Sequence, residues 1–241
     1  MAMIVSQTGH EALNFEVGDM QYQRYTGGFS LEIICTMLNP ALPKETHEIG
    51  AVLAGPDLAK SLREFDFSEK AFHYAFDFNW ENDSDNAGWW IRKPARRATV
   101  DVEFVFLRTF SWIAEDQDEE EEDEGDEDGE GSDPLQWVVE DVTEYIEPIR
   151  AAQAQFPSLK LAMSADGPIK RNGVIGCVGS PKRNVRRVVA SAPDDCVSVE
   201  SRARITAERA EFDRFIEALQ QEISAAEQAF FKTHPERAPK V

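Results

Sequence analysis

The feature that most constrains the fold of this chain is an acidic run that extends from Glu115 to Asp133. Fourteen of its nineteen residues are Asp or Glu, and the others are Gln, Gly or Ser. A segment without apolar side chains cannot bury enough surface to offset the entropy lost on ordering it. We therefore predict a disordered acidic loop at 115–133, which separates a β-rich half, residues 1–114, from an α+β half, residues 134–241.

The acidic run also dominates the charge of the chain. Without its fourteen negative charges the formal net charge of −20 falls to −6, so the remaining sequence is only mildly acidic. A negative charge of this size disfavours binding to nucleic acids and to anionic membranes, and it favours a basic protein partner. A purely solubilising role for the run stays open, because acidic blocks are often solvated linkers.

Cysteine usage and hydropathy narrow the class of protein. The three cysteines, Cys35, Cys177 and Cys196, are far apart and odd in number, which argues against a disulfide framework and against a zinc site. Residues 1–10 lack a signal-peptide pattern, and no segment approaches the roughly 20 apolar residues that span a bilayer. We expect a cytoplasmic protein without a cofactor, a bound metal or a membrane association.

Apolar residues at every second position predict several strands in the first half. A turn at Gly18-Asp19 is predicted to separate the first two of them, and a short helix is predicted at 58–65. The strands are, in chain order, 13–17, 20–25, 29–37 and 48–54. Because the connections are short, we expect a largely antiparallel sheet.

The clearest predicted strand is 72–80, in which five aromatic side chains alternate with other residues. These are Phe72, Tyr74, Phe76, Phe78 and Trp80. Full burial of such a face would contribute about 1.5–3 kcal/mol for each ring, so we expect a sheet with an aromatic-rich face. A turn at 81–88, an extended segment at 89–92 and a long strand at 99–110 follow.

The second half mixes strand and helix patterns. Residues 135–139 are apolar enough for a strand that pairs with the one ending near Ile113, which would make the acidic run an insertion in a hairpin. A helix is predicted at 143–155, because its apolar residues share one side. Short strands are predicted at 159–163, 174–178, 185–190 and 196–199.

The longest predicted helix spans residues 201–231. Apolar residues separated by three, four or seven positions form one stripe along it: Ile205, Phe212, Ile216, Leu219, Ile223, Ala226 and Phe230. Such a helix would be about 46 Å long, so it either packs across the sheet or pairs with a second copy of the chain in a homo-oligomer. Together these elements predict an α+β fold whose two halves pack as one globular body.

The concentration of carboxylates without a catalytic motif favours a non-enzymatic interaction protein. The histidines are scattered, and the sequence lacks the HExxH and GxSxG motifs, although an enzyme built from dispersed residues stays an open alternative. We predict that the acidic run binds a basic protein partner, as an inhibitor, an immunity-type protein or a nucleic-acid mimic would. The predicted contact residues are Glu119, Glu120, Glu121, Glu122, Asp123, Glu124, Asp126, Glu127 and Asp128.

The alternative function is a nucleic-acid-binding module that the acidic run inhibits. Two basic clusters suggest it, and the first also holds two tryptophans on which bases could stack while cations hold phosphates. The candidate residues are Trp89, Trp90, Arg92, Lys93, Arg96 and Arg97 in the first cluster, and Lys182, Arg183, Arg186 and Arg187 in the second. The simpler interpretation is that the tryptophans belong to the core and the cations to solvated loops.

Overall fold

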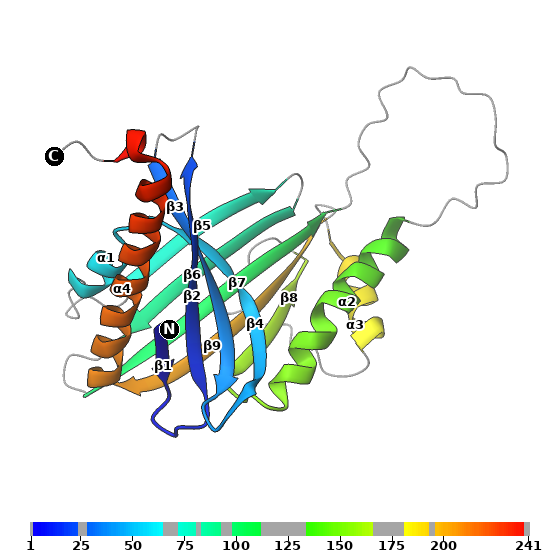
Figure 1. The fold of residues 1–241 in the computed structure, drawn as a ribbon. Coiled ribbons are helices and arrows are strands. Elements are labelled where there is room, and N and C mark those ends of the chain that lie inside the picture. Colours follow the sequence, from blue (N-terminus) through cyan, green and yellow to red (C-terminus); the bar gives the residue numbers. More distant parts are fainter. Residues whose placement is uncertain are drawn as a thin grey trace, which may run out of the picture.

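The computed structural model describes residues 2–23, 28–64, 72–80, 83–92, 98–111, 134–165, 181–192 and 196–238. Within these ranges, strands form one four-stranded and one five-stranded antiparallel sheet, and four α-helices pack around them. The protein therefore has the predicted α+β fold. Figure 1 shows the four-stranded sheet in front of the five-stranded one, with a long helix at one end and two helices at the other.

The first sheet is a meander whose strands pair in the order β1-β2-β3-β4. The strands are β1 (Ala2–Val5), β2 (Ala12–Gln23), β3 (Gly28–Asn39) and β4 (Leu42–Ala54). Leu13, Phe15, Leu31 and Ile33 are fully buried, as the alternating pattern predicts. The predicted strand at 48–54 extends back to Leu42. Pro43 does not interrupt it, because β4 is an edge strand, where a missing N–H is tolerated.

The predicted turn at Gly18-Asp19 is wrong, because β2 continues through these two residues as a β-bulge. Val17 pairs with Ile33 and Met20 pairs with Leu31, so two residues of β2 lie opposite one residue of β3. A Cβ atom at Gly18 would lie 3.3 Å from the carbonyl oxygen of β3 that it faces, which explains the glycine. The local turn signal marks an irregularity inside one strand.

The second sheet pairs its strands in the order β5-β6-β7-β9-β8. The strands are β5 (Phe72–Trp80), β6 (Asp83–Arg92), β7 (Thr99–Ser111), β8 (Leu159–Ser164) and β9 (Cys196–Glu208). The predicted strands at 72–80, 99–110 and 159–163 are confirmed. The predicted turn at 81–88 is too long, because Asp83 already pairs with Trp80.

The helices are α1 (Leu58–Glu64), α2 (Pro134–Gln153), α3 (Pro181–Val189) and α4 (Arg209–Thr233). The predicted strand at 135–139 is wrong, because these residues form the first turns of α2, which begins at a proline, a favoured first helical residue. The acidic run therefore connects β7 to a helix and is not a hairpin insertion. The predicted strand at 185–190 belongs to α3, and the one at 174–178 lies outside the described residues.

The predicted start of the C-terminal helix at residue 201 is wrong by eight residues. Residues 201–208 continue β9, in which Ser201, Ala203, Ile205 and Ala207 are buried at every second position. Ile205 stands seven positions before Phe212 and so fits a helical stripe as well as a strand face, which misplaced the boundary. The helix itself is confirmed from residue 209 onward.

The core joins both sheets and the long helix. Phe15 of β2 packs against Phe104 of β7, at 6.0 Å between ring centroids, and against Phe215 of α4, at 5.2 Å. At the far end of α4, Phe230 and Phe231 pack edge-on against Phe29 of β3. The apolar stripe of α4 is thus buried against its own chain.

The two sheets approach each other closely at Gly50 of β4. A Cβ atom at this position would lie 2.3 Å from Cδ2 of Phe106 in β7. The register of β4 against β3 shifts here, because Cys35 pairs with Gly50 while Thr36 pairs with Glu48. The bulge and the glycine together let the ring of Phe106 lie directly on the backbone of the opposite sheet.

Candidate functional site

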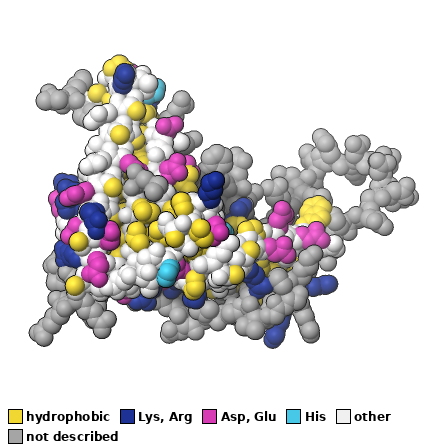
Figure 2. Space-filling view, turned by 60° about the horizontal axis from the view of Figure 1, so that its bottom comes forward, with side chains coloured by type: hydrophobic (Ala, Val, Ile, Leu, Met, Phe, Trp, Pro, Cys, Tyr) yellow, Lys and Arg dark blue, Asp and Glu magenta, His cyan; other side chains and the backbone are white. Residues whose placement is uncertain are grey.

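The carboxylates of the acidic run lie outside the described residues, but the helix that follows the run continues its charge. On α2, Glu140, Asp141, Glu144 and Glu147 are all exposed. Residues three, four and seven positions apart share one side of a helix, so these carboxylates form a single stripe. Figure 2 shows acidic side chains gathered over α2, at the right-hand end of the molecule.

A large exposed aromatic side chain lies on the same side of α2. Trp137 is 59% exposed, compared with 51% for Leu42 and 36% for Tyr22. Asp141 and Glu144 follow it by four and seven positions and therefore flank it on the helix surface. Exposed tryptophan is uncommon on free surfaces and is enriched among the residues that dominate the energy of protein–protein interfaces.

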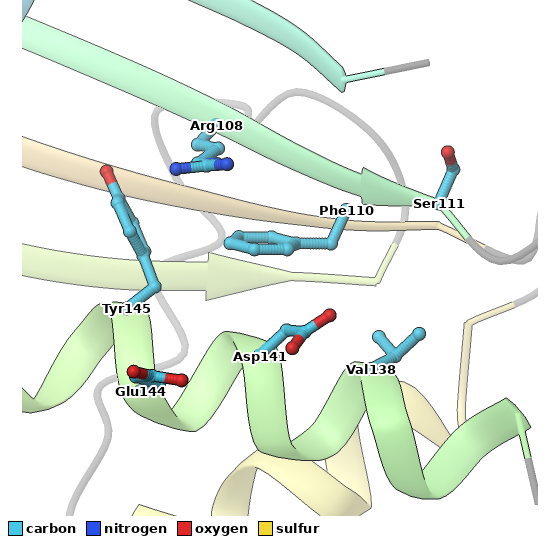
Figure 3. A pocket seen from close by; sticks show the side chains of 7 residues that line it. All are labelled: Arg108, Phe110, Ser111, Val138, Asp141, Glu144 and Tyr145. Atoms are coloured by element: carbon cyan, nitrogen blue, oxygen red, sulfur yellow. The ribbon is translucent and has the colours of Figure 1, made fainter. Parts of the chain in front are cut away.

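A pocket of about 350 Å³ lies between the end of β7 and the first half of α2 (Figure 3). The residues that line it are Arg108, Phe110, Ser111, Val138, Asp141, Glu144 and Tyr145. It opens beside the two elements that flank the acidic run, because β7 ends at residue 111 and α2 begins at residue 134. The pocket therefore adjoins the acidic stripe and shares two carboxylates with it.

Aromatic rings fix the position of the cation in this pocket. The guanidinium carbon of Arg108 lies 5.2 Å from the ring centroid of Phe110 and 5.2 Å from that of Tyr145. The two rings pack against each other at 5.5 Å in an edge-on arrangement. Contacts of this kind contribute about 0.5–2 kcal/mol each, so they hold both the guanidinium and the aromatic floor in place.

The carboxylates of the pocket are available for a ligand. Among the residues that the structure describes, no lysine, arginine or histidine forms an ion pair with Asp141 or Glu144, and both side chains are exposed. Val138 and Phe110, in contrast, are each 8% exposed and supply an apolar floor. The site thus combines free negative charge, a buried apolar surface and one fixed cation.

The residues of the first basic cluster are only partly described. In the β6–β7 pairing, Trp89 lies opposite Phe104, a core residue, and Trp90 lies opposite Glu103. Arg92 lies opposite Asp101 at the end of β6. Lys93, Arg96 and Arg97 lie outside the described residues. A shared binding surface of the two clusters therefore stays a prediction.

The second basic cluster lies on α3. Lys182 and Arg183 belong to its first turn, and Arg186 and Arg187 are exposed. α3 packs against α2, and Figure 1 shows the two helices side by side at the same end of the molecule. The exposed cations of α3 are therefore carried by a helix that neighbours the acidic stripe.

A second charged cluster occupies the paired strands β7 and β9. Arg202 donates to Glu103 at 3.0 Å and, through Nε, to Glu200 at 2.9 Å, and the two carboxylate side chains are 8% and 10% exposed. Arg204 donates to Asp101 at 2.7 Å. Each of these carboxylates already has a cationic partner, so this charged ladder stabilises the pairing of two strands rather than offering a vacant site.

Two described residues of types that take part in catalysis, Cys35 and His47, have a shifted pKa. Burial raises the pKa of the Cys35 thiol well above its ordinary value, and the charge of Glu48 raises it further, so Cys35 is a protonated thiol of the core. Burial lowers the pKa of the half-buried His47. Among the described residues no three His, Cys, Asp or Glu side chains are grouped as metal ligands.

No helix in the described ranges is both long enough and apolar enough to cross a bilayer. No protein-family model matches the chain, and comparison with curated proteins and with solved structures finds no match. The surface chemistry of the described residues is therefore the guide to function.

The acidic stripe and Trp137 are not predicted from the sequence when residues 135–139 are assigned to a strand. A helical reading of the same residues would place Trp137, Asp141 and Glu144 at positions i, i+4 and i+7. The contribution of Arg108 had no local signal, because its contacts with Phe110 and Tyr145 require β7 and α2 to be adjacent.

Proposed function

We propose that this chain is a non-enzymatic interaction protein that binds a basic protein partner. Its binding surface comprises the acidic run, residues 115–133, together with the exposed stripe of α2. The observation that carries the proposal is the position of Trp137, 59% exposed, on the same side of α2 as Asp141 and Glu144. Solubility alone would explain a run of charged residues, but it would not explain an exposed indole among carboxylates. This combination of residues is typical of a binding surface.

The two parts of this surface would act at different distances. The fourteen carboxylates of the run raise the rate of encounter with a basic partner, and salt at physiological ionic strength screens this attraction at distances beyond about 8 Å. Trp137 acts on contact, because burying an indole removes about 150–250 Å² of surface from water. A partner held only by charge would lack the second contribution.

The proposed roles as an inhibitor, an immunity-type protein or a nucleic-acid mimic all require this surface. In each of them the carboxylates occupy the positions that a basic protein otherwise offers to its anionic ligand. The partner would therefore carry clustered lysine or arginine at its own functional site. Blocking that site needs no catalytic group on this chain.

The test is a comparative affinity purification followed by mass spectrometry. The bait proteins are the full chain, a variant that lacks residues 115–133 and the variant Trp137→Ala. The proposal predicts a basic protein that the full chain recovers and that both variants recover less efficiently at physiological salt. Equal recovery of every partner by all three baits would refute it.

Nucleic-acid binding is the second candidate, and the exposed Arg186 and Arg187 of α3 favour it. Against it, α3 packs on α2, so a phosphate backbone that approached α3 would also meet the carboxylates of the stripe. Binding of a labelled single-stranded oligonucleotide, followed by fluorescence anisotropy at 50 and 200 mM salt, decides the matter. A steep salt dependence that Arg186→Gln reduces would favour this function over the first.

A further inference from the structure

We infer that the pocket between β7 and α2 receives one lysine or arginine side chain of the basic partner. This inference depends on the proposed function and makes it specific, because it assigns one pocket to one type of residue. The pocket measures about 350 Å³ and lies beside Trp137, at the junction of the acidic run with α2. It is therefore within reach of any partner segment that the acidic surface attracts.

The cation would be held by Asp141 and Glu144. These residues are three positions apart on α2, line the pocket and have no cationic partner among the described residues. Hydrogen bonds from an ammonium or guanidinium group to a carboxylate are shorter and roughly twice as strong as neutral ones. Two carboxylates at one opening can thus accept several donors from a single side chain.

The methylene stem of the same side chain would lie on the apolar floor. Phe110, Val138 and Tyr145 supply this floor, and the first two are each 8% exposed. Lysine and arginine side chains commonly bury their stems on apolar surface while the charged group stays at the rim. A simple metal cation could use the carboxylates but would gain nothing from the floor.

Arg108 would contact the main chain of the partner segment. Figure 3 shows Arg108 and Asp141 on opposite sides of the Phe110 ring, so the fixed cation and the free carboxylate are separated by an aromatic side chain. A guanidinium group is a donor only, and peptide carbonyl oxygens are acceptors that it can satisfy. A peptide with one basic residue therefore complements the cationic and anionic parts of the pocket together.

The experiment compares two variants that lose the same charge from the same helix. Asp141→Asn with Glu144→Gln neutralises the pocket, whereas Glu140→Gln with Glu147→Gln neutralises two exposed carboxylates that do not line it. All substitutions are nearly isosteric and fall at exposed positions, and the thermal unfolding of each variant is recorded as a control.

The probe is a seven-residue glycine-serine peptide with one central arginine, and its matched control carries citrulline, which keeps the shape and removes the charge. Binding to the full chain is followed by two-dimensional NMR titration. The inference predicts that the arginine peptide binds, that citrulline weakens binding about tenfold or more, and that the pocket pair of substitutions does the same. The control pair belongs to the same acidic stripe, so it is expected to weaken binding as well, but at least about threefold less than the pocket pair does.

Two other results would overturn the inference and leave the proposed function intact. The first is an equal loss of affinity for the arginine peptide in the two double variants. The second is equal affinity of the full chain for the citrulline and arginine peptides. In both cases the proposed function stands if the full chain still binds a ten-residue lysine-rich peptide. Failure of the full chain to bind either basic peptide would instead contradict both the inference and the proposed function. The lysine-rich peptide thus separates failure of the pocket from failure of the surface.

Discussion

Replacing Gly50 by alanine tests how the two sheets are held together. A Cβ atom at this position would lie 2.3, 2.4 and 2.8 Å from three carbon atoms of the Phe106 ring, so the ring or the β4 backbone must move by roughly an ångström. Phe106 lies in β7 between register partners on β6 and β9, which restricts where its ring can go. Overpacking of this kind costs about 1–3 kcal/mol.

The assay is urea unfolding followed by circular dichroism for Gly50→Ala, Phe106→Ala and the double variant. We expect Gly50→Ala to lower the free energy of unfolding by about 1–3 kcal/mol, which corresponds to about 2–4 °C in Tm for each kcal/mol in a chain of this size. In the Phe106→Ala background the same substitution should cost less, because the ring atoms in its way are gone, and the remaining cost comes from the φ of +158° at Gly50, which side chains rarely adopt. Equal costs in the two backgrounds would refute the proposed contact.

Three further predictions concern charge and exposure. Because burial lowers the pKa of His47 in the folded state, the unfolded chain binds more protons near and below the ordinary histidine pKa of about 6.5. The free energy of unfolding should therefore fall as the pH drops from 7 to 5. In urea unfolding, His47→Gln should reduce this fall, whereas the exposed control His10→Gln should leave it the same as in the unchanged chain. Arg202→Met leaves two nearly buried glutamate side chains without a cation and should lower the free energy of unfolding by about 2–3 kcal/mol, measured by thermal unfolding. Arg204→Met removes a half-exposed ion pair and should lower it by less than about 1 kcal/mol. Similar losses in the two variants would contradict this difference in burial. Trp137→Ala should leave the free energy of unfolding within about 0.5 kcal/mol and weaken binding of the basic partner by about 2 kcal/mol, and a large loss of stability would show that the indole is a packing residue instead.

The sequence predicted the strands of this protein better than its helices. Strong alternation, as in 72–80 and 99–110, identified β5 and β7 nearly to the residue. One source of error is a segment in which two periods coexist. Ile205 fits both a helical stripe and a strand face, and only the pairing of β9 with β7 selects the strand.

Short apolar segments were the other source of error. Residues 135–139 and 185–190 are too short for periodicity to distinguish a strand from a helix, and packing determines the outcome. In α3, Val185, Val188 and Val189 are buried at helical spacing although valine favours strands. Tertiary contacts with α2 outweigh that preference.

The candidate site was only partly visible in the sequence. Composition identified the acidic run, but the pocket needs Arg108 of β7 and Tyr145 of α2 to be adjacent, and 36 residues separate them in the chain. No local pattern encodes such a contact. Helical periodicity could have predicted the stripe on α2, but the first turns of α2 are instead assigned to a strand.

The measurement that tests the central claim most directly is the affinity of a ten-residue lysine-rich peptide for the folded surface of α2. Three proteins are compared by fluorescence anisotropy at 150 mM salt. They are the full chain, the chain without residues 115–133, and a full-length variant in which Glu140, Asp141, Glu144 and Glu147 are changed to the corresponding amides.

If the folded stripe is part of the binding surface, the amide variant should bind about tenfold or more weakly although all fourteen carboxylates of the run remain. The deletion variant should retain measurable binding through α2. An amide variant that binds as tightly as the full chain, together with a deletion variant that does not bind, would show that the run alone attracts basic ligands and would contradict the account.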